Sequence, residues 1–323
     1  MKKAIVCGAG GFIGGHMVKR LLDEGYKILA LDIKPRQDWY QVHEEAMNQG
    51  LFDLRDADNV NEVFKSADFD EVYQFAADMG GAGYIFTGEH DADVMHNSAT
   101  INLNIAHAVA AFSPKTKVFY SSSACIYPAH NQTDPDNPNC EESSAYPAHP
   151  DSEYGWEKLF SERLYRSFAR NYGLNVRIAR FHNIFGPYGT WDGGKEKAPA
   201  AMCRKALQAS ESMEVWGPGT QTRSFLYIDE CIEAVRRLME SDVETVINIG
   251  SDEMISINNL ARMALDLADK QNIELKNIDG PVGVMGRCSD NNLIEEKLGW
   301  RPSEPLVDGM KKTLNWIAEQ LEK

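Results

Sequence analysis

The stretch Ala4-Ile5-Val6-Cys7-Gly8-Ala9-Gly10-Gly11-Phe12-Ile13-Gly14 joins an apolar run to a glycine-rich turn that opens an amphipathic segment. Glycines in such a turn let the backbone fold tightly and approach a pyrophosphate, which then lies on the amide groups of a helix N-terminus. A glycine pattern alone is also typical of a plain turn. Asp32, however, ends the next apolar run, where a carboxylate can bind a ribose hydroxyl. Together these features predict a dinucleotide-binding site.

The predicted dinucleotide is NAD. A carboxylate at Asp32 repels the additional 2′-phosphate of NADP, although Lys34 and Arg36 follow closely and leave that alternative open. The residues in this part of the chain that we expect to bind the cofactor are Gly8, Gly11, Phe12, Ile13, Gly14 and Asp32.

Apolar runs alternate with amphipathic stretches through the first half of the chain. The runs that are typical of strands are 4–7, 27–32, 71–76, 117–123 and 175–181. Strands that alternate with helices form a parallel sheet, and ligands bind at the carboxyl ends of its strands. The pattern therefore predicts an α/β protein with a Rossmann-type doubly wound parallel sheet.

After the fifth of these runs the loops become rich in Gly, Pro and Trp, which indicates a change of domain. We expect an NAD-binding Rossmann domain over 1–181 and a smaller C-terminal α/β substrate-binding domain over 182–323. Short strand-like pieces at 225–228 and 246–249 suggest that the segment 224–250 returns to the first domain.

Length, charge and cysteine content restrict the class of protein. The 323 residues carry a net charge of −15, which disfavours nucleic-acid binding because that binding depends on basic side chains. The sequence contains no apolar run of membrane-spanning length and no signal-peptide pattern, so we expect a cytoplasmic protein that does not bind a membrane. The six cysteines are scattered without zinc-ligand spacing, so we expect neither structural disulfides nor a metal site.

Tyr154 and Lys158 lie four residues apart at the start of an expected helix, so their side chains share one face. A tyrosine has a pKa near about 10, and it acts as a base at neutral pH only when positive charge lies nearby. Lys158 and an oxidised nicotinamide can supply that charge. The pair is also compatible with an ordinary exposed helix surface. Ser123, at the end of an apolar run, can hold a substrate hydroxyl for the tyrosine.

The glycine turn, Asp32, the serine run that ends at Ser123, and the Tyr154/Lys158 pair together resemble the extended short-chain dehydrogenase/reductase family of nucleotide-sugar enzymes. The likeness covers nearly the whole chain. It implies that Asp53 contacts the adenine end of NAD, and that Tyr154 and Lys158 contact the cofactor. Six longer blocks resemble one epimerase branch of this family, at residues 76–81, 122–128, 180–187, 195–201, 221–225 and 250–254.

Cys125 is the residue that distinguishes branches of this family. The related 4,6-dehydratases carry an Asp-Glu pair where this chain has Ala124-Cys125. A thiolate can remove a proton next to a ketone when an adjacent cation stabilises it, and the resemblance implies Lys197 as that cation. Without the flanking blocks, Cys125 would be interpreted as a small buried hydrophobic residue.

The resemblance implies an isomerase that acts on GDP-mannose or a related nucleotide sugar. Tyr154 takes the C4 hydroxyl proton while hydride passes to NAD, and Ser123 orients that hydroxyl. The resulting 4-ketone acidifies C3 and C5, where Cys125 and Lys197 exchange protons on opposite faces of the ring. NAD is regenerated in each turnover. The residues expected to bind substrate are Gly80, Ser123, Ala124, Cys125, Asn183, Glu196, Lys197, Ala198, Lys205, Gln221, Arg223 and Arg287.

An acidic protein needs local cations to bind a doubly charged diphosphate. The resemblance points to Arg223 and Arg287, and the planar guanidinium of arginine matches the geometry of phosphate oxygens. Arg223 and Arg287 can also be ordinary solvated charges. For Lys205, which the resemblance also points to, that interpretation is as strong as the functional one. The residues leave open whether the base is guanine.

Other functions remain compatible with the same motifs. A 4-epimerase or a 4,6-dehydratase for another nucleotide sugar would have the same fold. A non-catalytic, NAD-sensing regulator would be expected to carry a broken Tyr154/Lys158 pair, which is intact here.

The resemblance also implies a homodimer. We expect the helices near 91–111 and 154–172 to pair across a two-fold axis. Their apolar surface is expected from Leu159, Leu164 and Phe168, unless these side chains face the core.

Overall fold

The central sheet contains seven strands, all parallel, in the order β3-β2-β1-β4-β5-β6-β11. The computed structural model describes residues 1–323, apart from the side chains of residues 48 and 49. The strands are β1 (Lys3–Cys7), β2 (Lys27–Asp32), β3 (Met47–Leu51), β4 (Glu71–Gln74), β5 (Lys117–Ser123), β6 (Asn175–Phe181) and β11 (Ile247–Ile249). An order that runs outward from β1 in both directions confirms the predicted doubly wound Rossmann sheet.

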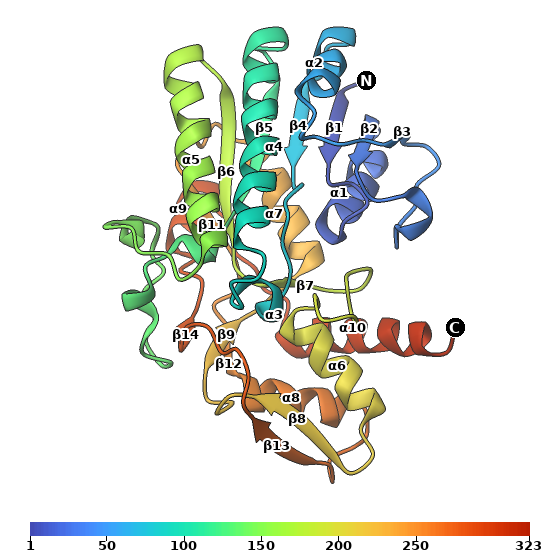
Figure 1. Ribbon diagram of the computed structural model, residues 1–323, viewed down its shortest axis with the longest axis vertical. Helices are drawn as coiled ribbons and strands as arrows, with labels where there is room; N and C mark the ends of the chain where they lie inside the picture. The colour runs from blue at the N-terminus through green and yellow to red at the C-terminus, as the bar shows by residue number, and fades with distance from the viewer.

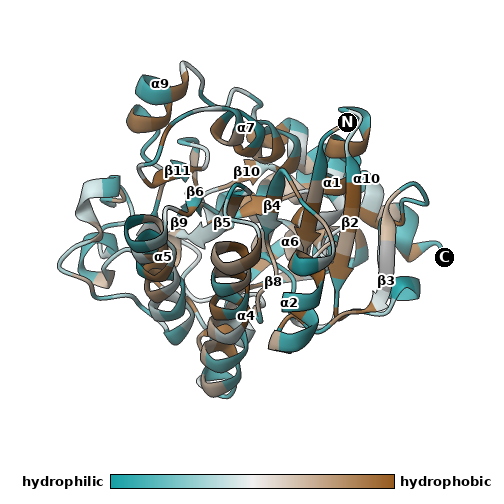
Figure 2. Ribbon diagram, turned by 90° about the horizontal axis from the view of Figure 1, so that it is seen from above, coloured by the Kyte–Doolittle hydropathy of each residue, from teal (hydrophilic) through white to brown (hydrophobic). Residues whose placement is uncertain are grey.

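Helices cover both faces of this sheet (Figures 1 and 2). One face carries α2 (Ala57–Ser66), α4 (Asp91–Phe112) and α5 (Glu153–Tyr172), and the other carries α1 (Phe12–Asp23) and α7 (Ile228–Glu240). Within β1, Ala4 and Val6 pack with α1 and α7, whereas Ile5 and Cys7 pack on the opposite face. Because alternate side chains point to opposite faces and both faces are buried, the strands are continuous apolar runs.

A smaller group of helices and short strands lies beyond the carboxyl ends of the main strands, in the lower half of Figure 1. Its sheets pair β7 (Ile184–Phe185) with β10 (Leu226–Tyr227), β9 (Thr222–Ser224) with β12 (Met254–Ser256) and β14 (Gly286–Arg287), and β8 (Ser212–Trp216) with β13 (Glu274–Ile278). The helices of this part are α3 (Ala82–Ile85), α6 (Ala198–Gln208), α8 (Ile257–Leu267) and α10 (Leu306–Leu321), whereas α9 (Asn292–Leu298) packs beside β11 of the main sheet. Over the described residues, none of the helices has the length and apolar character needed to cross a bilayer.

The chain returns from this smaller part to the main sheet through α7 and β11. β11 extends the sheet beside β6, with Ile247 opposite Ala179. The strand expected at 225–228 does not join the main sheet, because Leu226 and Tyr227 pair with β7. β7 comes shortly after β6 in the chain but lies outside the main sheet, and it pairs with these two residues instead. The start of the expected returning segment 224–250 was therefore wrong.

A buried ion pair joins β6 to α5. Arg180 donates from Nε and Nη2 to the two carboxylate oxygens of Glu162, each over 2.9 Å, and both side chains are almost fully buried. Ser122, on β5, donates its hydroxyl to the same carboxylate. Burial opposes the charge of Arg180, but the nearby Glu162 outweighs it and raises the pKa of Arg180. The pair thus fixes α5, whose first turn carries Tyr154, against β5 and β6.

Replacing Glu162 with Gln leaves the charge of Arg180 buried without its partner. We expect Glu162→Gln to lower the free energy of unfolding by about 3 kcal/mol, measured by urea denaturation. The control is Glu153→Gln at an exposed position of the same helix, which should cost about 0.5 kcal/mol or less. An equal loss in the two variants would show that the ion pair does not stabilise the contact of α5 with the sheet.

Candidate active site

A cavity of about 590 Å³ lies at the carboxyl ends of the main strands and reaches the start of α6. The glycine turn after β1, Asp32 at the end of β2 and Ser123 at the end of β5 all line it. Every residue expected to hold the cofactor lies on this one cavity. The expected site residues that line it are Gly8, Gly11, Phe12, Ile13, Gly14, Asp32, Asp53, Gly80, Ser123, Tyr154, Lys158 and Lys197.

The glycine turn has no room for side chains. A Cβ atom on Gly14 would lie 2.0 Å from the carbonyl oxygen of Gly8, which is backbone and cannot move aside without moving the loop. Gly8 has a φ of +80°, and its Cβ atom would lie 2.8 Å from the amide nitrogen of Ala76. Gly11 directly precedes helix α1 and has no side chain that could cap the first amides of the helix. Those amides are therefore free to bind an anion, as a pyrophosphate site requires.

The carboxylate of Asp32 is held by the same turn. It accepts hydrogen bonds of 2.8 Å from the amides of Gly10 and Lys34. Burial raises the pKa of Asp32, and these backbone bonds oppose the shift. A carboxylate oriented in this way at the edge of the cavity can accept hydrogen bonds from ribose hydroxyls. Together with the uncapped helix amides, it makes the site fit NAD.

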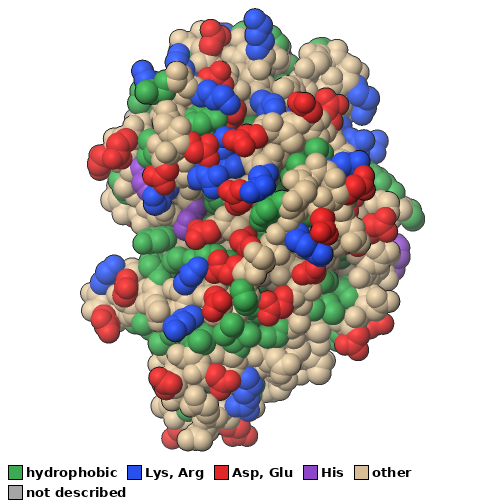
Figure 3. Space-filling model, turned by 180° about the vertical axis from the view of Figure 1, so that it is seen from behind, with side chains coloured by type: hydrophobic (Ala, Val, Ile, Leu, Met, Phe, Trp, Pro, Cys, Tyr) green, Lys and Arg blue, Asp and Glu red, His purple; other side chains and the backbone are tan. Residues whose placement is uncertain are grey.

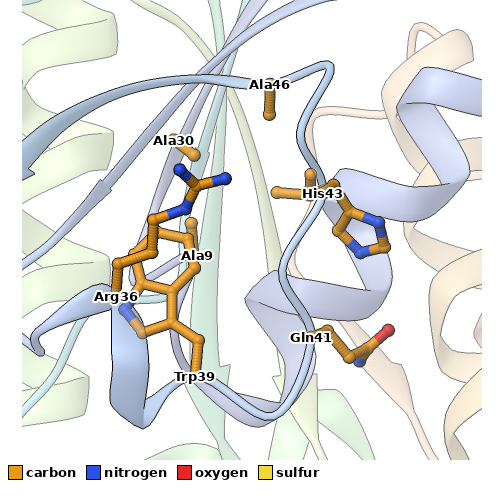
Figure 4. A pocket seen from close by; sticks show the side chains of 8 residues that line it. Ala9, Ala30, Arg36, Trp39, Gln41, His43 and Ala46 are labelled. Carbon is orange, nitrogen blue, oxygen red and sulfur yellow. The ribbon is translucent and has the colours of Figure 1, made fainter.

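The basic residues after Asp32 do not form a phosphate pocket. Arg36 makes a 2.7 Å ion pair with Glu44, so its charge is already compensated. Lys34 lies over the ring of Tyr40. Figure 4 shows Arg36 and Trp39 around a second, very small cavity of about 10 Å³, which has space for no more than a water molecule. This arrangement favours NAD over NADP.

Asp53, which the resemblance assigns to the adenine end of NAD, lines the cavity. Arg55 binds its carboxylate through Nε and Nη2 and lowers the pKa of Asp53. The same guanidinium donates to Asn97 over 2.9 Å. Arg55 and Asn97 line the cavity as well, and the sequence motifs pointed to neither of them.

Tyr154 and Lys158 share one face of α5, as their spacing predicts. Ser152 caps this helix by accepting from the amide of Gly155, and the Lys158 ammonium donates to the carbonyl of Ser121 over 2.9 Å. Burial raises the pKa of Tyr154, while a hydrogen bond from Ser123 opposes the shift. Burial also lowers the pKa of Lys158. The phenol therefore stays protonated at neutral pH in the protein alone, and it needs further positive charge to act as a base.

Cys125 contacts a different cation from the one expected. The guanidinium Nη1 of Arg287 lies 3.1 Å from the sulfur, within hydrogen-bond distance. Lys197, the expected partner, directly precedes α6 and its side chain makes no cap hydrogen bond. It is exposed and lines the cavity. The surrounding protein lowers the pKa of Lys197, and the nearby Cys125 opposes that shift. Both cations act on the thiol, but Arg287 makes the direct contact.

Several residues expected to bind substrate do not line the cavity. Glu196 binds Arg204 and the amide of Gly194, Lys205 donates to the carbonyl of Glu214, and Asn183 donates to the carbonyl of Ser224. These contacts orient the side chains but leave their role toward substrate a prediction. The expected residues outside the cavity lining are Ala124, Cys125, Asn183, Glu196, Ala198, Lys205, Gln221, Arg223 and Arg287.

The two arginines expected to bind the diphosphate differ in whether a carboxylate of the protein already pairs with their charge. Arg287 makes a buried ion pair of 2.9 Å with Asp151. Arg223 donates to the carbonyls of Thr222, Val282 and Val284, and none of the described carboxylates forms an ion pair with it. Burial and repulsion by Arg287 lower the pKa of Arg223 to about 10. A bound anion would stabilise its charge, so Arg223 is the better candidate for the diphosphate.

Cationic side chains gather near the cavity of this acidic protein. Figure 3 shows acidic and basic side chains interspersed over the face opposite to that of Figure 1. Near the cavity, by contrast, four cationic side chains interact electrostatically with Cys125: Lys158, Lys197, Arg223 and Arg287. The acidic chain thus carries the local cations that an anionic substrate requires.

Known proteins resemble this chain closely. The sequence profile of the NAD dependent epimerase/dehydratase family matches residues 4–250. A relative from Oryza sativa subsp. indica, named GDP-mannose 3,5-epimerase 1, is 47% identical over 321 residues. The matched region covers 98% of this chain and 82% of that relative.

Solved structures share the fold but differ in the activities they are named for. The UDP-glucose 4-epimerase of Thermotoga maritima matches with a TM-score of 0.85 at 23% identity, over 99% of both chains. A dTDP-glucose 4,6-dehydratase of Bacillus anthracis matches with a TM-score of 0.84 at 20% identity, over 100% of this chain and 98% of that one. Because an epimerase and a dehydratase fit almost equally well, the fold alone does not select the reaction.

The tight turn gives a test of the cofactor site. In Gly14→Ala, the new methyl group meets the Gly8 carbonyl, so we expect a loss of stability of about 1–3 kcal/mol together with a lower NAD content. Urea denaturation and the NAD released from the denatured protein measure the two effects. Gly15→Ala on the same helix is the control, since its Cβ meets only the flexible side chain of Gln41. Full NAD content in Gly14→Ala would contradict the assigned role of the turn.

Proposed function

The chain belongs to the NAD-dependent epimerase/dehydratase family, and on that premise we propose that it is a GDP-mannose 3,5-epimerase. It converts GDP-D-mannose to GDP-L-galactose, and it releases the 5-epimer GDP-L-gulose when only C5 is inverted. The full-length likeness to the rice relative of that name supports the substrate.

The observation that carries this proposal is a thiol beside the redox tyrosine. Cys125 and Tyr154 pack in one cluster, and burial, followed by the nearby Cys125, raises the pKa of Tyr154. The preceding residue, Ala124, is buried and has no acidic group. A dehydratase needs a carboxyl group here to protonate the leaving hydroxyl, whereas a thiol with cations around it suits proton exchange next to a ketone.

The first part of the reaction takes place at C4 of the sugar. In its phenolate form, Tyr154 accepts the proton of the C4 hydroxyl, and Ser123, which hydrogen-bonds the phenol oxygen, orients that hydroxyl. The Lys158 ammonium lies 5.7 Å from the centre of the Tyr154 ring and stabilises negative charge on the phenol oxygen. The residues that line the cavity would hold NAD, which would supply a hydride acceptor at C4 and a hydride donor at the end of the cycle.

The second part takes place at the carbons on either side of the ketone. A C4 ketone acidifies the protons on C3 and C5, so a thiolate at Cys125 can take one as the electron pair moves onto the carbonyl oxygen. The Lys197 ammonium, which lines the cavity, returns a proton to the other face. After this step Cys125 is a thiol and Lys197 is a neutral amine. At the second carbon the pair either acts with its roles reversed or first exchanges protons with solvent, and either route gives the doubly inverted product.

Proton exchange with solvent tests the proposal. The protein is incubated with GDP-mannose in deuterated water, and the sugar is analysed by nuclear magnetic resonance. Deuterium at both C3 and C5 supports the 3,5-epimerase. A keto-deoxy product would instead assign a 4,6-dehydratase, and inversion at C4 without exchange would assign a 4-epimerase. Absence of any turnover with NAD bound would favour a regulator.

Variants separate the redox step from the epimerisation step. Cys125→Ala should still give a C4-oxidised sugar, detected by mass as the loss of two hydrogens, but it should not exchange the C5 proton. Cys125→Ser should behave in the same way, because a hydroxyl is a far weaker base than a thiolate. Tyr154→Phe is the matched contrast, and it should keep NAD bound while giving no oxidised sugar. Full exchange at both carbons in Cys125→Ala would show that the cysteine only packs.

We propose in addition that the protein is a homodimer whose interface is formed by α4 and α5. Of the apolar residues expected there, Leu159 is buried, and Leu164 and Phe168 are partly buried and pack against the main core, which is the alternative that the sequence left open. The exposed apolar residues of these helices include Leu103, at 44% exposure, and Trp156 and Phe160, at 41% and 46%, whereas Phe112 and Tyr172 lie at the carboxyl ends of the two helices. Trp156 and Phe160 lie one helical turn apart, so they form a continuous exposed patch.

Light scattering at micromolar concentration tests the dimer. We expect the wild-type protein to have twice the mass of one chain, and Phe160→Glu to be a monomer because a charge would be buried in the interface. Val307→Glu, at a similarly exposed position of α10, is the control and should stay dimeric. A wild-type monomer, or a dimeric Phe160→Glu protein, would contradict the interface.

We also propose that the protein acts in the cytoplasm. All six cysteines are free thiols, which suits a reducing compartment.

A further inference from the structure

The guanidinium of Arg287 lies in a buried cluster beside the active site. It donates from Nη1 to the Cys125 sulfur over 3.1 Å, from Nε to Gln132 Oε1 over 2.5 Å and from Nη2 to Asp151 Oδ2 over 2.9 Å. The Arg287 and Asp151 side chains are only 6% and 8% exposed. Each nitrogen of the guanidinium therefore has a partner within the protein, and one of these partners is the thiol.

The partners of Arg287 are themselves held in place. Gln132 donates from Nε2 to the carbonyls of Tyr127 and Pro128, which directs its oxygen toward the guanidinium. Asp151 directly precedes Ser152, the residue that caps α5. Because a planar guanidinium bound at several edges has a single orientation, Nη1 is held toward Cys125.

The groups around Arg287 favour its charged form although it is buried. Burial opposes the charge of Arg287, but Cys125 and then Asp151 outweigh it, so the pKa of Arg287 is raised. A guanidinium that stays charged next to a sulfur stabilises the thiolate through a charge-assisted hydrogen bond. Arg223, which lacks such a carboxylate partner, is left to bind an anion from solution.

We propose that Arg287 is a positioning residue that stabilises the thiolate form of Cys125 through its direct contact with the sulfur, and that Asp151 holds Arg287 in place while moderating its charge. Neither residue needs to touch the sugar for this role. The role deepens the proposed function, on which it rests for the reaction that the thiolate serves.

The reactivity of the thiol toward iodoacetamide tests this role in the absence of sugar. The NAD-containing protein is alkylated over a range of pH values, and peptide mass spectrometry measures the rate at Cys125 separately from Cys288, which is also partly exposed. In Arg287→Gln, we expect the rate at neutral pH to fall roughly tenfold and the whole curve to shift to higher pH, because the nearest opposite charge is gone. Arg287→Lys retains the charge and should restore part of the rate.

Asp151→Asn should shift the curve in the opposite direction. The Asn side chain still offers an oxygen to Arg287, but the negative charge close to the thiolate is lost, so the thiolate forms at lower pH. Two variants of one ion pair that shift the curve in opposite directions are the signature of electrostatic control. If the ion pair had a purely structural role, Arg287→Gln and Asp151→Asn would disturb the site in the same way and shift the alkylation curve in the same direction.

Arg223→Gln is the matched control, because this arginine lies nearby without contacting the sulfur. It should shift the alkylation curve less than Arg287→Gln does, while it raises KM for GDP-mannose more than it lowers kcat. An unchanged curve in Arg287→Gln, or shifts in the same direction in Arg287→Gln and Asp151→Asn, would overturn the proposal. If Arg287→Gln does not fold, as judged by its thermal transition, Arg287→Lys and Asp151→Asn decide. If the wild-type protein fails to exchange deuterium, the proposed function is overturned. The alkylation rates would still show whether Arg287 controls the reactivity of Cys125.

Discussion

Four cationic side chains surround one thiol in a protein whose net charge is −15, and this arrangement shapes the chemistry of the site. Each anion of the proposed reaction, whether phenolate, thiolate or diphosphate, needs positive charge in a region where burial penalises all charges. The parallel sheet makes this possible, because its strands end at one edge and bring Ser123 and the helix with Tyr154 together there. Arg287, from a short sheet in the smaller part of the chain, completes the set by contacting Cys125.

The choice of a thiol follows from the same electrostatics. An ionised carboxyl group beside the Tyr154 phenol would add negative charge and further disfavour a phenolate. In the proposed reaction, a thiol adds that charge only while it is deprotonated, and it loses the charge when it accepts a proton. The chain can thus hold a base at C5 and a base at C4 in the same cluster, since the two need not be charged at the same moment.

Local patterns in the sequence predict the part of the site that local structure builds. The turn with Gly14 and the carboxylate of Asp32 follow from the needs of a strand, a tight loop and a helix, and the spacing of Tyr154 and Lys158 follows from the helix period. The contact of Arg287 with Cys125 spans 162 residues and depends on how a short strand packs, so no spacing could indicate it. The exposed face of α5 was also missed, because the helix has apolar residues on both sides and only packing shows that Phe160 faces outward.

The central claim is that one bound sugar presents C4 to Tyr154 and C5 to Cys125. A crystal structure of the Tyr154→Phe variant with NAD and GDP-mannose tests it most directly, because this variant should bind both molecules without turnover. The account predicts that C5 lies about 3.5 Å from the Cys125 sulfur, that the C4 hydroxyl points at the Phe ring edge, and that the diphosphate lies on Arg223. A sugar bound in the cavity with C3 and C5 both directed away from Cys125 would contradict it.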